Sequence, residues 1–207
     1  MYAAFLKLAG RRVVIVGGGT VAAGKLEALL DEGADVTVVA PQIRPGMERP
    51  GVTVIRRACE ARALDGAWGV VAAAPPEVNR QVGDAAARRR IFVNAVDDPA
   101  HASAYLGGVV RRGDVTVAIS TNGRAPALAG LMREALDGWL PADLDAWMEA
   151  ADEMRRTWKR DGIAMECRRP LLLEALNRLY DAKGHRRVIA GEGSSAPAGP
   201  PAADRVK

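Results

Sequence analysis

Three consecutive glycines follow a run of branched apolar residues near the start of the chain, in RRVVIVGGGTVAAGKLEALL over residues 11–30. Gly17, Gly19 and Ala22 fit the G-x-G-x-x-A pattern of a dinucleotide-binding turn. The first glycine permits the tight turn, the second lets a pyrophosphate approach the backbone, and the small third residue lets the helix pack on the strand. The free N–H groups of the helix start would bind the phosphates. The spacing predicts a dinucleotide site; the alternative is an ordinary strand-to-helix turn.

The strand expected next, DVTVVA over residues 35–40, lacks the acidic residue that usually holds the ribose hydroxyls of a dinucleotide. It ends in Ala40 and Pro41 instead. No arginine replaces the acid directly, although Arg44 is nearby. Sequence spacing alone therefore does not choose between NAD and NADP.

Asp97 is the second candidate for chemistry, because it follows a strand expected over residues 91–96 (IFVNAV). A carboxylate at a strand end could take a proton from a substrate or briefly hold an entering metal ion. The structural alternative is an acidic turn, since Asp98 precedes Pro99. His101 could carry a second proton or escort a metal, or it could be a solvated loop histidine.

The elements that would position these residues alternate between short apolar strands and helices. We expect strands over residues 13–16, 35–40, 51–56, 68–73, 91–96 and 115–120, and helices over 20–31 and 78–90. This alternation predicts an α/β fold with a Rossmann-like parallel sheet, whose ligand crevice lies at the carboxyl ends of the strands. From about residue 127 to 181 the sequence is typical of helices.

Composition narrows the class of protein further. The formal net charge is +4, but the basic residues are dispersed and only 4% of residues are aromatic, unlike a nucleic-acid-binding surface. Cys59 and Cys167 stand far apart without a C-x-x-C motif, which argues against a disulfide framework or a structural metal. No apolar run approaches the roughly 18 residues of a membrane span. We expect a cytoplasmic protein without membrane or nucleic-acid partners.

Three motifs, in order and spacing, resemble one known family. They are VVIVGGGTVAAGKLEALLDEGADVTVVAP, VNAVDDP and VAISTNGRAPALAGLMREALDGWLP, and the resemblance covers about residues 2–181. The chain resembles the siroheme synthase N-terminal family, which comprises precorrin-2 dehydrogenases that in some members are also sirohydrochlorin ferrochelatases. The resemblance implies an NAD-binding Rossmann domain over 1–112, a dimerisation or connecting region over 113–141 and a helical domain over 142–185. A Pro-, Gly- and Ser-rich stretch over 186–207 is expected to be a disordered tail.

The same resemblance assigns site residues. Those expected to bind the cofactor are Gly17, Gly18, Gly19, Thr20, Val21, Ala40, Pro41 and Asn79, and those expected near the substrate are Ser120, Thr121, Gly123 and Arg124. Asp97 matches the Asp that the family uses in both chemical steps. Arg124 and Asn122 depart from the small residues usual there, and Arg124 is a candidate cation for the substrate's carboxylates. Gly24, inside the first helix, is a further departure. No stable metal site is expected, because one carboxylate coordinates only transiently.

The function implied is NAD-dependent oxidation of precorrin-2 to sirohydrochlorin by a homodimer, with insertion of Fe²⁺ to give siroheme as a second activity in bifunctional members. Two alternatives stay open. One is a chelatase for iron or cobalt without dehydrogenase activity, and the other is a regulatory module that senses NAD without chemistry.

Overall fold

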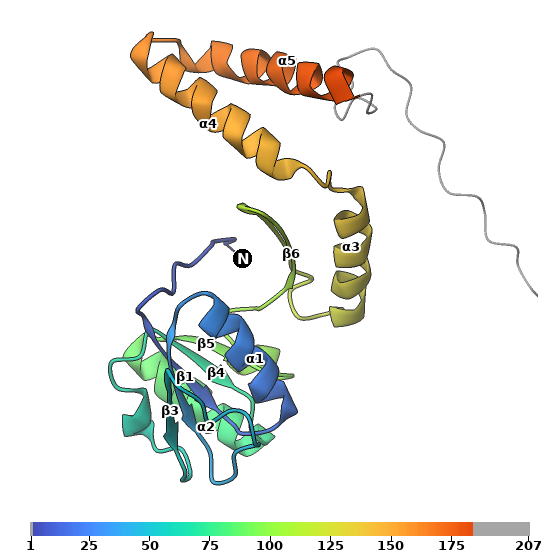
Figure 1. The fold of residues 1–207 in the computed structure, drawn as a ribbon. Helices are drawn as coiled ribbons and strands as arrows, with labels where there is room; N and C mark the ends of the chain where they lie inside the picture. Colours follow the sequence, from blue (N-terminus) through green and yellow to red (C-terminus); the bar gives the residue numbers. More distant parts are fainter. Residues whose placement is uncertain (1, 184–207) are drawn as a thin grey trace, which may run out of the picture. The chain divides into compact units, whose positions relative to one another are not determined.

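A computed structural model describes residues 2–183 of the chain (Figure 1). These residues belong to two compact units. The first comprises the described residues up to Val110 together with Val117–Trp139, and the second comprises Arg111–Thr116 together with residues 140–183. The tail expected over residues 186–207 lies outside the described residues. The domain boundaries expected from the sequence stay a prediction.

The first unit is built on a five-stranded parallel sheet. Its strands are β1 (Arg12–Val16), β2 (Asp35–Val39), β3 (Val52–Ile55), β4 (Gly69–Ala72) and β5 (Phe92–Ala95), in the order β3-β2-β1-β4-β5. The chain moves outward from β1 to β3 and then crosses back to β4 on the other side of β1. The predicted Rossmann-like α/β fold is therefore confirmed. In such sheets the ligand binds outside the carboxyl ends of the strands where the order reverses, here between β1 and β4.

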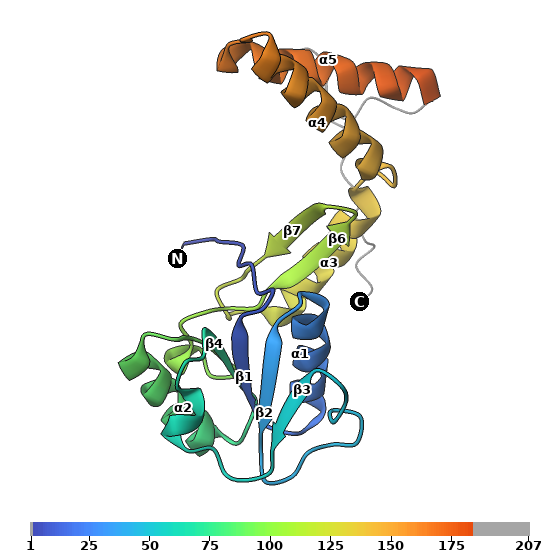
Figure 2. The same cartoon turned by 60° about the vertical axis from the view of Figure 1, so that its left-hand side comes forward.

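Two helices cover opposite faces of this sheet, as Figure 2 shows. They are α1 (Thr20–Asp31) and α2 (Pro76–Arg89). Because side chains alternate along a strand, Ile15 of β1 packs in one apolar cluster with Leu26 of α1. Val14 packs in the other cluster with Val82 of α2. Burial on both faces explains why β1 is a continuous apolar run rather than an alternating one.

The outer edge of β5 is covered by the segment that follows a short 3₁₀ turn, η2 (Pro99–His101). The N–H groups of Ser103 and Ala104 both donate to the Val93 carbonyl at 2.9 Å. The Ser103 hydroxyl accepts from the Val93 N–H, also at 2.9 Å. This pairing satisfies edge groups that would otherwise face water, and it holds the chain just after Asp97 against the sheet.

The strand expected over residues 115–120 does not join the parallel sheet. It forms β7 (Val115–Ile119) and pairs with β6 (Gly108–Arg112), a strand that was not predicted from the sequence. Helix α3 (Pro126–Trp139) follows β7. The physical reason for the difference is local: only two residues separate β6 and β7, so pairing these neighbours closes a much shorter loop than returning to β5 would.

The second unit contains helices α4 (Leu144–Arg160) and α5 (Met165–Lys183), which agrees with the helical pattern of this region. Trp158 is buried near the end of α4, and its carbonyl accepts the Ile163 N–H at 3.0 Å. The Arg168 guanidinium donates twice to the Ile163 carbonyl, at 3.0 and 2.9 Å. These contacts define the turn between the two helices.

Candidate cofactor and active site

The three glycines of the turn after β1 differ in how much space surrounds them. Gly17 has φ +134°, and a Cβ there would lie 2.2 Å from the Ala73 carbonyl oxygen. A Cβ on Gly18 would lie 2.0 Å from the Gln42 carbonyl oxygen, whereas a Cβ on Gly19 would meet no atom within 4 Å. Gly17 and Gly18 are therefore required by backbone that packs against the turn, and Gly19 leaves open space in front of α1.

Helix α1 begins at this open space without a side-chain cap. Gly19 is the N-cap residue and supplies no side-chain cap, and the first turn of α1 contains no acidic residue. The first N–H groups of a helix lack intrahelical partners and carry the positive end of its dipole. Helix starts of this kind bind pyrophosphates in other proteins, and contact of Thr20 and Val21 with the cofactor stays a prediction. The turn fits a dinucleotide on steric and electrostatic grounds.

A cavity of ≈ 310 Å³ lies beside the turn, at the carboxyl ends of β4 and β5. Its lining residues are Val21, Ala73, Ala74, Pro76, Asn79, Val96, Asp97 and Asp98. Three residues predicted from the sequence, Val21, Asn79 and Asp97, therefore meet in one place. They come from α1, α2 and the end of β5, which are brought together by the strand order.

Asn79 shapes the wall of this cavity. Its side chain is only 3% exposed. Its Oδ1 accepts the Ala74 N–H at 3.0 Å, and its Nδ2 donates to the Val96 carbonyl at 3.4 Å. The amide thereby connects the chain leaving β4 to the chain leaving β5. This structural task was missed from the sequence; direct contact of Asn79 with the cofactor stays a prediction.

Asp97 presents an unengaged carboxylate at the cavity. Its backbone is in the left-handed region, with φ +57°, a conformation that costs energy for most residues but is tolerated by Asp and Asn. The residue is exposed, and within residues 2–183 its carboxylate has no hydrogen-bond or ion-pair partner. A carboxylate in this state is available to accept a proton from a bound molecule.

Asp98 lines the same cavity but has a fixed partner. His101 Nδ1 lies 2.9 and 2.8 Å from the two Asp98 carboxylate oxygens. Because an ionised carboxylate only accepts hydrogen bonds, Nδ1 carries the proton. The hydrogen bond from His101 lowers the pKa of Asp98 below its usual range. The sequence left open whether His101 has a chemical role or is a solvated loop residue. In the structure its side chain binds Asp98, the neighbour of Asp97.

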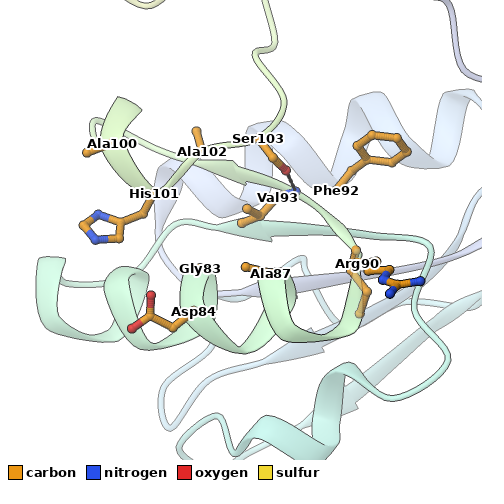
Figure 3. A pocket seen from close by; sticks show the side chains of 11 residues that line it. Gly83, Asp84, Ala87, Arg90, Phe92, Val93, Ala100, His101, Ala102 and Ser103 are labelled. Carbon is orange, nitrogen blue, oxygen red and sulfur yellow. Dashed lines mark hydrogen bonds between the residues drawn. The ribbon is translucent and has the colours of Figure 1, made fainter.

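His101 also lines a second cavity, of ≈ 440 Å³, between α2 and residues 100–103 (Figure 3). Gly83 of α2 allows the two segments to approach, because a Cβ there would lie 3.0 Å from the His101 Cβ. Asp84 and Arg90 contribute the other charged side chains of the lining. None of the residues predicted to bind cofactor or substrate lines this cavity.

The residues predicted near the substrate form the turn before α3. The Thr121 hydroxyl accepts the Ala125 N–H at 3.3 Å, and the Ser120 hydroxyl accepts the Asn122 N–H at 3.2 Å. Asn122 and Gly123 both have positive φ. None of the four predicted residues lines the cavity at Asp97.

Gly123 nevertheless brings this turn close to the loop after β5. A Cβ on Gly123 would lie 3.2 Å from the Tyr105 ring and 3.4 Å from Pro99 Cγ. Pro99 directly follows Asp98 in the chain. The turn therefore packs next to the Asp97-Asp98 loop, with the Arg124 side chain exposed.

Residues 2–183 contain neither a cluster of metal ligands nor a membrane-spanning helix. Within the part of the chain that the structure describes, no three His, Cys, Asp or Glu side chains gather as metal ligands would. Over the same residues no helix is both long and apolar enough to cross a bilayer. The cytoplasmic location expected from the sequence stays a prediction.

Two known families match consecutive parts of the chain. Residues 4–108 match a family described as putative NAD(P)-binding. The chain belongs to this NAD(P)-binding family. Residues 112–137 match a second family, described as the sirohaem biosynthesis protein central region. The resemblance to the siroheme synthase N-terminal family is thereby confirmed, and the family's dinucleotide region covers the glycine turn, the cavity and Asp97.

Individual relatives point to the same family. Siroheme synthase 1 of Aeromonas hydrophila is 41% identical over 160 residues, which cover 75% of this chain and 35% of that protein. The siroheme synthase of Citrobacter koseri is 38% identical over 170 residues, covering 80% and 37%. The chain thus spans about a third of the length of these curated relatives. Among solved structures, "SirC, precorrin-2 dehydrogenase" is similar with a TM-score of 0.66 and 27% identity, over 84% of this chain and 88% of that one.

Proposed function

We propose that this protein oxidises precorrin-2 to sirohydrochlorin with NAD as the acceptor. The observation that carries the proposal is the position of Asp97, an unengaged carboxylate on the wall of a cavity that adjoins the dinucleotide turn. Similarity to a precorrin-2 dehydrogenase over most of both chains supports the choice of substrate.

The reaction removes a hydride and a proton from one conjugated ring system. When bound, the nicotinamide supplies the hydride acceptor. The N–H groups at the start of α1 would hold the pyrophosphate, and the cavity lined by Val21 and Asn79 would orient the rest of the cofactor. Asp97 would accept the proton at its carboxylate. Asp98 would not compete for this role, because its oxygens are occupied by His101.

Substrate affinity is proposed to depend on cations near the loop after β5. Precorrin-2 carries eight carboxylates, and basic groups guide and hold such a polyanion. Arg124 is exposed on the turn that packs against Pro99, which supports this role for its guanidinium. Arg111 and Arg112, two nearby arginines, are engaged within the protein, Arg112 by a bond to the Leu140 carbonyl at 3.3 Å.

A homodimer is proposed on the basis of α3. Leu128, Leu131 and Trp139 of this helix are 50%, 65% and 68% exposed, which is unusual for large apolar side chains on one helix. Light scattering of the purified chain tests the proposal. The expected mass is twice that of one chain, and Leu131→Glu should shift it toward a single chain, whereas a monomeric wild type would contradict the proposal.

Insertion of Fe²⁺ into sirohydrochlorin is proposed as a second reaction at the same carboxylate. Asp97 could receive pyrrole protons and contact the entering ion briefly, and iron is here a substrate rather than a resident cofactor. Consumption of sirohydrochlorin on addition of Fe²⁺ without NAD tests this step. Faster consumption with Co²⁺ would favour the cobalt alternative.

The decisive experiment is an anaerobic assay of the purified chain with precorrin-2 and NAD, followed by the absorbance of sirohydrochlorin. NAD-dependent product formation supports the dehydrogenase. Binding of NAD without product would favour the sensing module. Metal-dependent consumption of sirohydrochlorin without any oxidation of precorrin-2 would favour the chelatase.

A further inference from the structure

The loop that follows β2 lies directly against the glycine turn. The Arg44 N–H donates to the Gly18 carbonyl at 2.8 Å. A Cβ on Gly18 would lie 2.0 Å from the Gln42 carbonyl oxygen and 2.8 Å from the Ile43 Cα, so the two backbones touch. The position of Arg44 relative to the start of α1 is therefore set by main-chain contacts and not only by its flexible side chain.

The Arg44 guanidinium is held beside the phosphate-binding helix start by a neutral group. Its Nη1 donates to the Thr20 hydroxyl at 2.8 Å. Across residues 2–183 no carboxylate forms an ion pair with Arg44. Two acidic side chains of this region are paired elsewhere, Glu27 with Arg49 and Glu48 with Arg56. The charge of Arg44 is thus uncompensated, and most of its five N–H donors remain for a ligand.

The side chains at the end of β2 do not select against a phosphate. In Rossmann sites an Asp or Glu at this end binds the ribose 2′-hydroxyl of NAD, whereas a nearby Arg accommodates the 2′-phosphate of NADP. Here the position is taken by Ala40, which is 6% exposed, and by Pro41. Neither side chain can bind a ribose hydroxyl, and neither repels an anion.

We propose that Arg44 binds the 2′-phosphate of NADP, so that the site accepts NADP as well as NAD. The guanidinium is planar and can donate two parallel hydrogen bonds to a phosphate. The proposal rests on the dinucleotide site of the proposed function but not on the oxidation of precorrin-2, so it is tested by binding alone.

The test is calorimetric titration of the full chain with NAD⁺ and with NADP⁺, which differ only in the 2′-phosphate. For the wild type we expect NADP⁺ to bind at least as tightly as NAD⁺. Arg44→Ala should weaken NADP⁺ by about 10-fold or more, the usual effect of losing hydrogen bonds to a charged group, and NAD⁺ by less than about 3-fold. Arg44→Lys should fall between, because it keeps the charge without the paired donors.

Controls separate this role from a structural one. Arg49→Ala removes a partly exposed arginine of the same loop that pairs with Glu27 rather than with the turn, and it should leave both affinities unchanged. The thermal unfolding midpoint of Arg44→Ala shows whether the loop stays in place. An equal loss of NAD⁺ and NADP⁺, or wild-type binding of NAD⁺ alone, would overturn the proposal. Absence of binding by either cofactor would instead contradict the dinucleotide site itself.

Discussion

Asp97 and Asp98 are adjacent in the chain, yet only one of the two carboxylates is engaged. Asp98 accepts the His101 Nδ1–H at 2.8 Å, while Asp97 has no such partner among residues 2–183. Both side chains line the cavity beside the glycine turn. The two residues therefore differ in role. Asp98 anchors the loop after β5, and Asp97 is free to accept a proton in the proposed reaction.

The first prediction concerns Asp97→Asn. Asn adopts the left-handed conformation as readily as Asp, so the variant should fold and bind NAD normally. Removing a general base should lower the turnover of precorrin-2 by about 10²- to 10⁴-fold. Anaerobic kinetics and NAD titration measure the two properties separately. A wild-type turnover in this variant would show that the catalytic role was wrongly assigned.

The second prediction concerns the buried amide of Asn79. Replacing Asn79 with Ala leaves the Ala74 N–H and the Val96 carbonyl without their partner. An unsatisfied buried polar group costs about 1–3 kcal/mol, so the free energy of unfolding in urea should fall by that amount. Gln81→Ala is the matched control, since it removes an exposed amide from the same helix, and it should change stability by less than about 0.5 kcal/mol.

The third prediction contrasts two glycines near the start of α1. Gly18→Ala forces a methyl group toward the Gln42 carbonyl, and the loop carrying Arg44 must move. We expect weaker cofactor binding together with lower stability. If Gly18→Ala bound NAD as the wild type does, the close packing at this turn would not matter for the site.

Gly24→Ala is the control for Gly18→Ala, because a Cβ at Gly24 meets no atom within 4 Å. Position 24 lies inside a helix, where alanine is favoured over glycine by about 1 kcal/mol. The variant should therefore unfold at higher urea concentration and keep its cofactor affinity.

The fourth prediction is a pH dependence of stability. The His101 hydrogen bond lowers the pKa of Asp98 in the folded state, relative to about 3.9 in an unfolded chain. Its stabilising contribution is fully present above the unfolded value and is lost as the pH falls through the lower folded value. The difference in urea midpoint between wild type and Asp98→Asn should accordingly be present at about pH 5 and shrink below about pH 4.

His101→Ala provides the control for this pH dependence, because it removes the same hydrogen bond from the other side. Its difference from wild type should shrink in the same acidic range. A difference that stays constant from about pH 5 to about pH 3 would mean that the pair does not stabilise the fold through ionised Asp98.

Local patterns in the sequence were enough to predict the nucleotide-binding half of the fold. A buried parallel strand has to be apolar throughout and a tight strand-to-helix turn needs small residues, so β1, the glycine turn and α1 could all be read from neighbouring residues. Asn79 and Asp97 were predicted as site residues from the family resemblance, and the strand order brings both to one cavity beside the glycine turn.

Contacts between distant parts of the chain were decided only by the tertiary structure. Arg44 reaches Thr20 across 24 residues, and Gly18 is required because Gln42 packs on it. The pairing of β6 with β7, instead of extension of the parallel sheet, likewise depends on which surfaces meet. Residue type and periodicity describe how each segment buries its own apolar face. They do not specify which backbone atoms of other segments will lie within hydrogen-bonding distance.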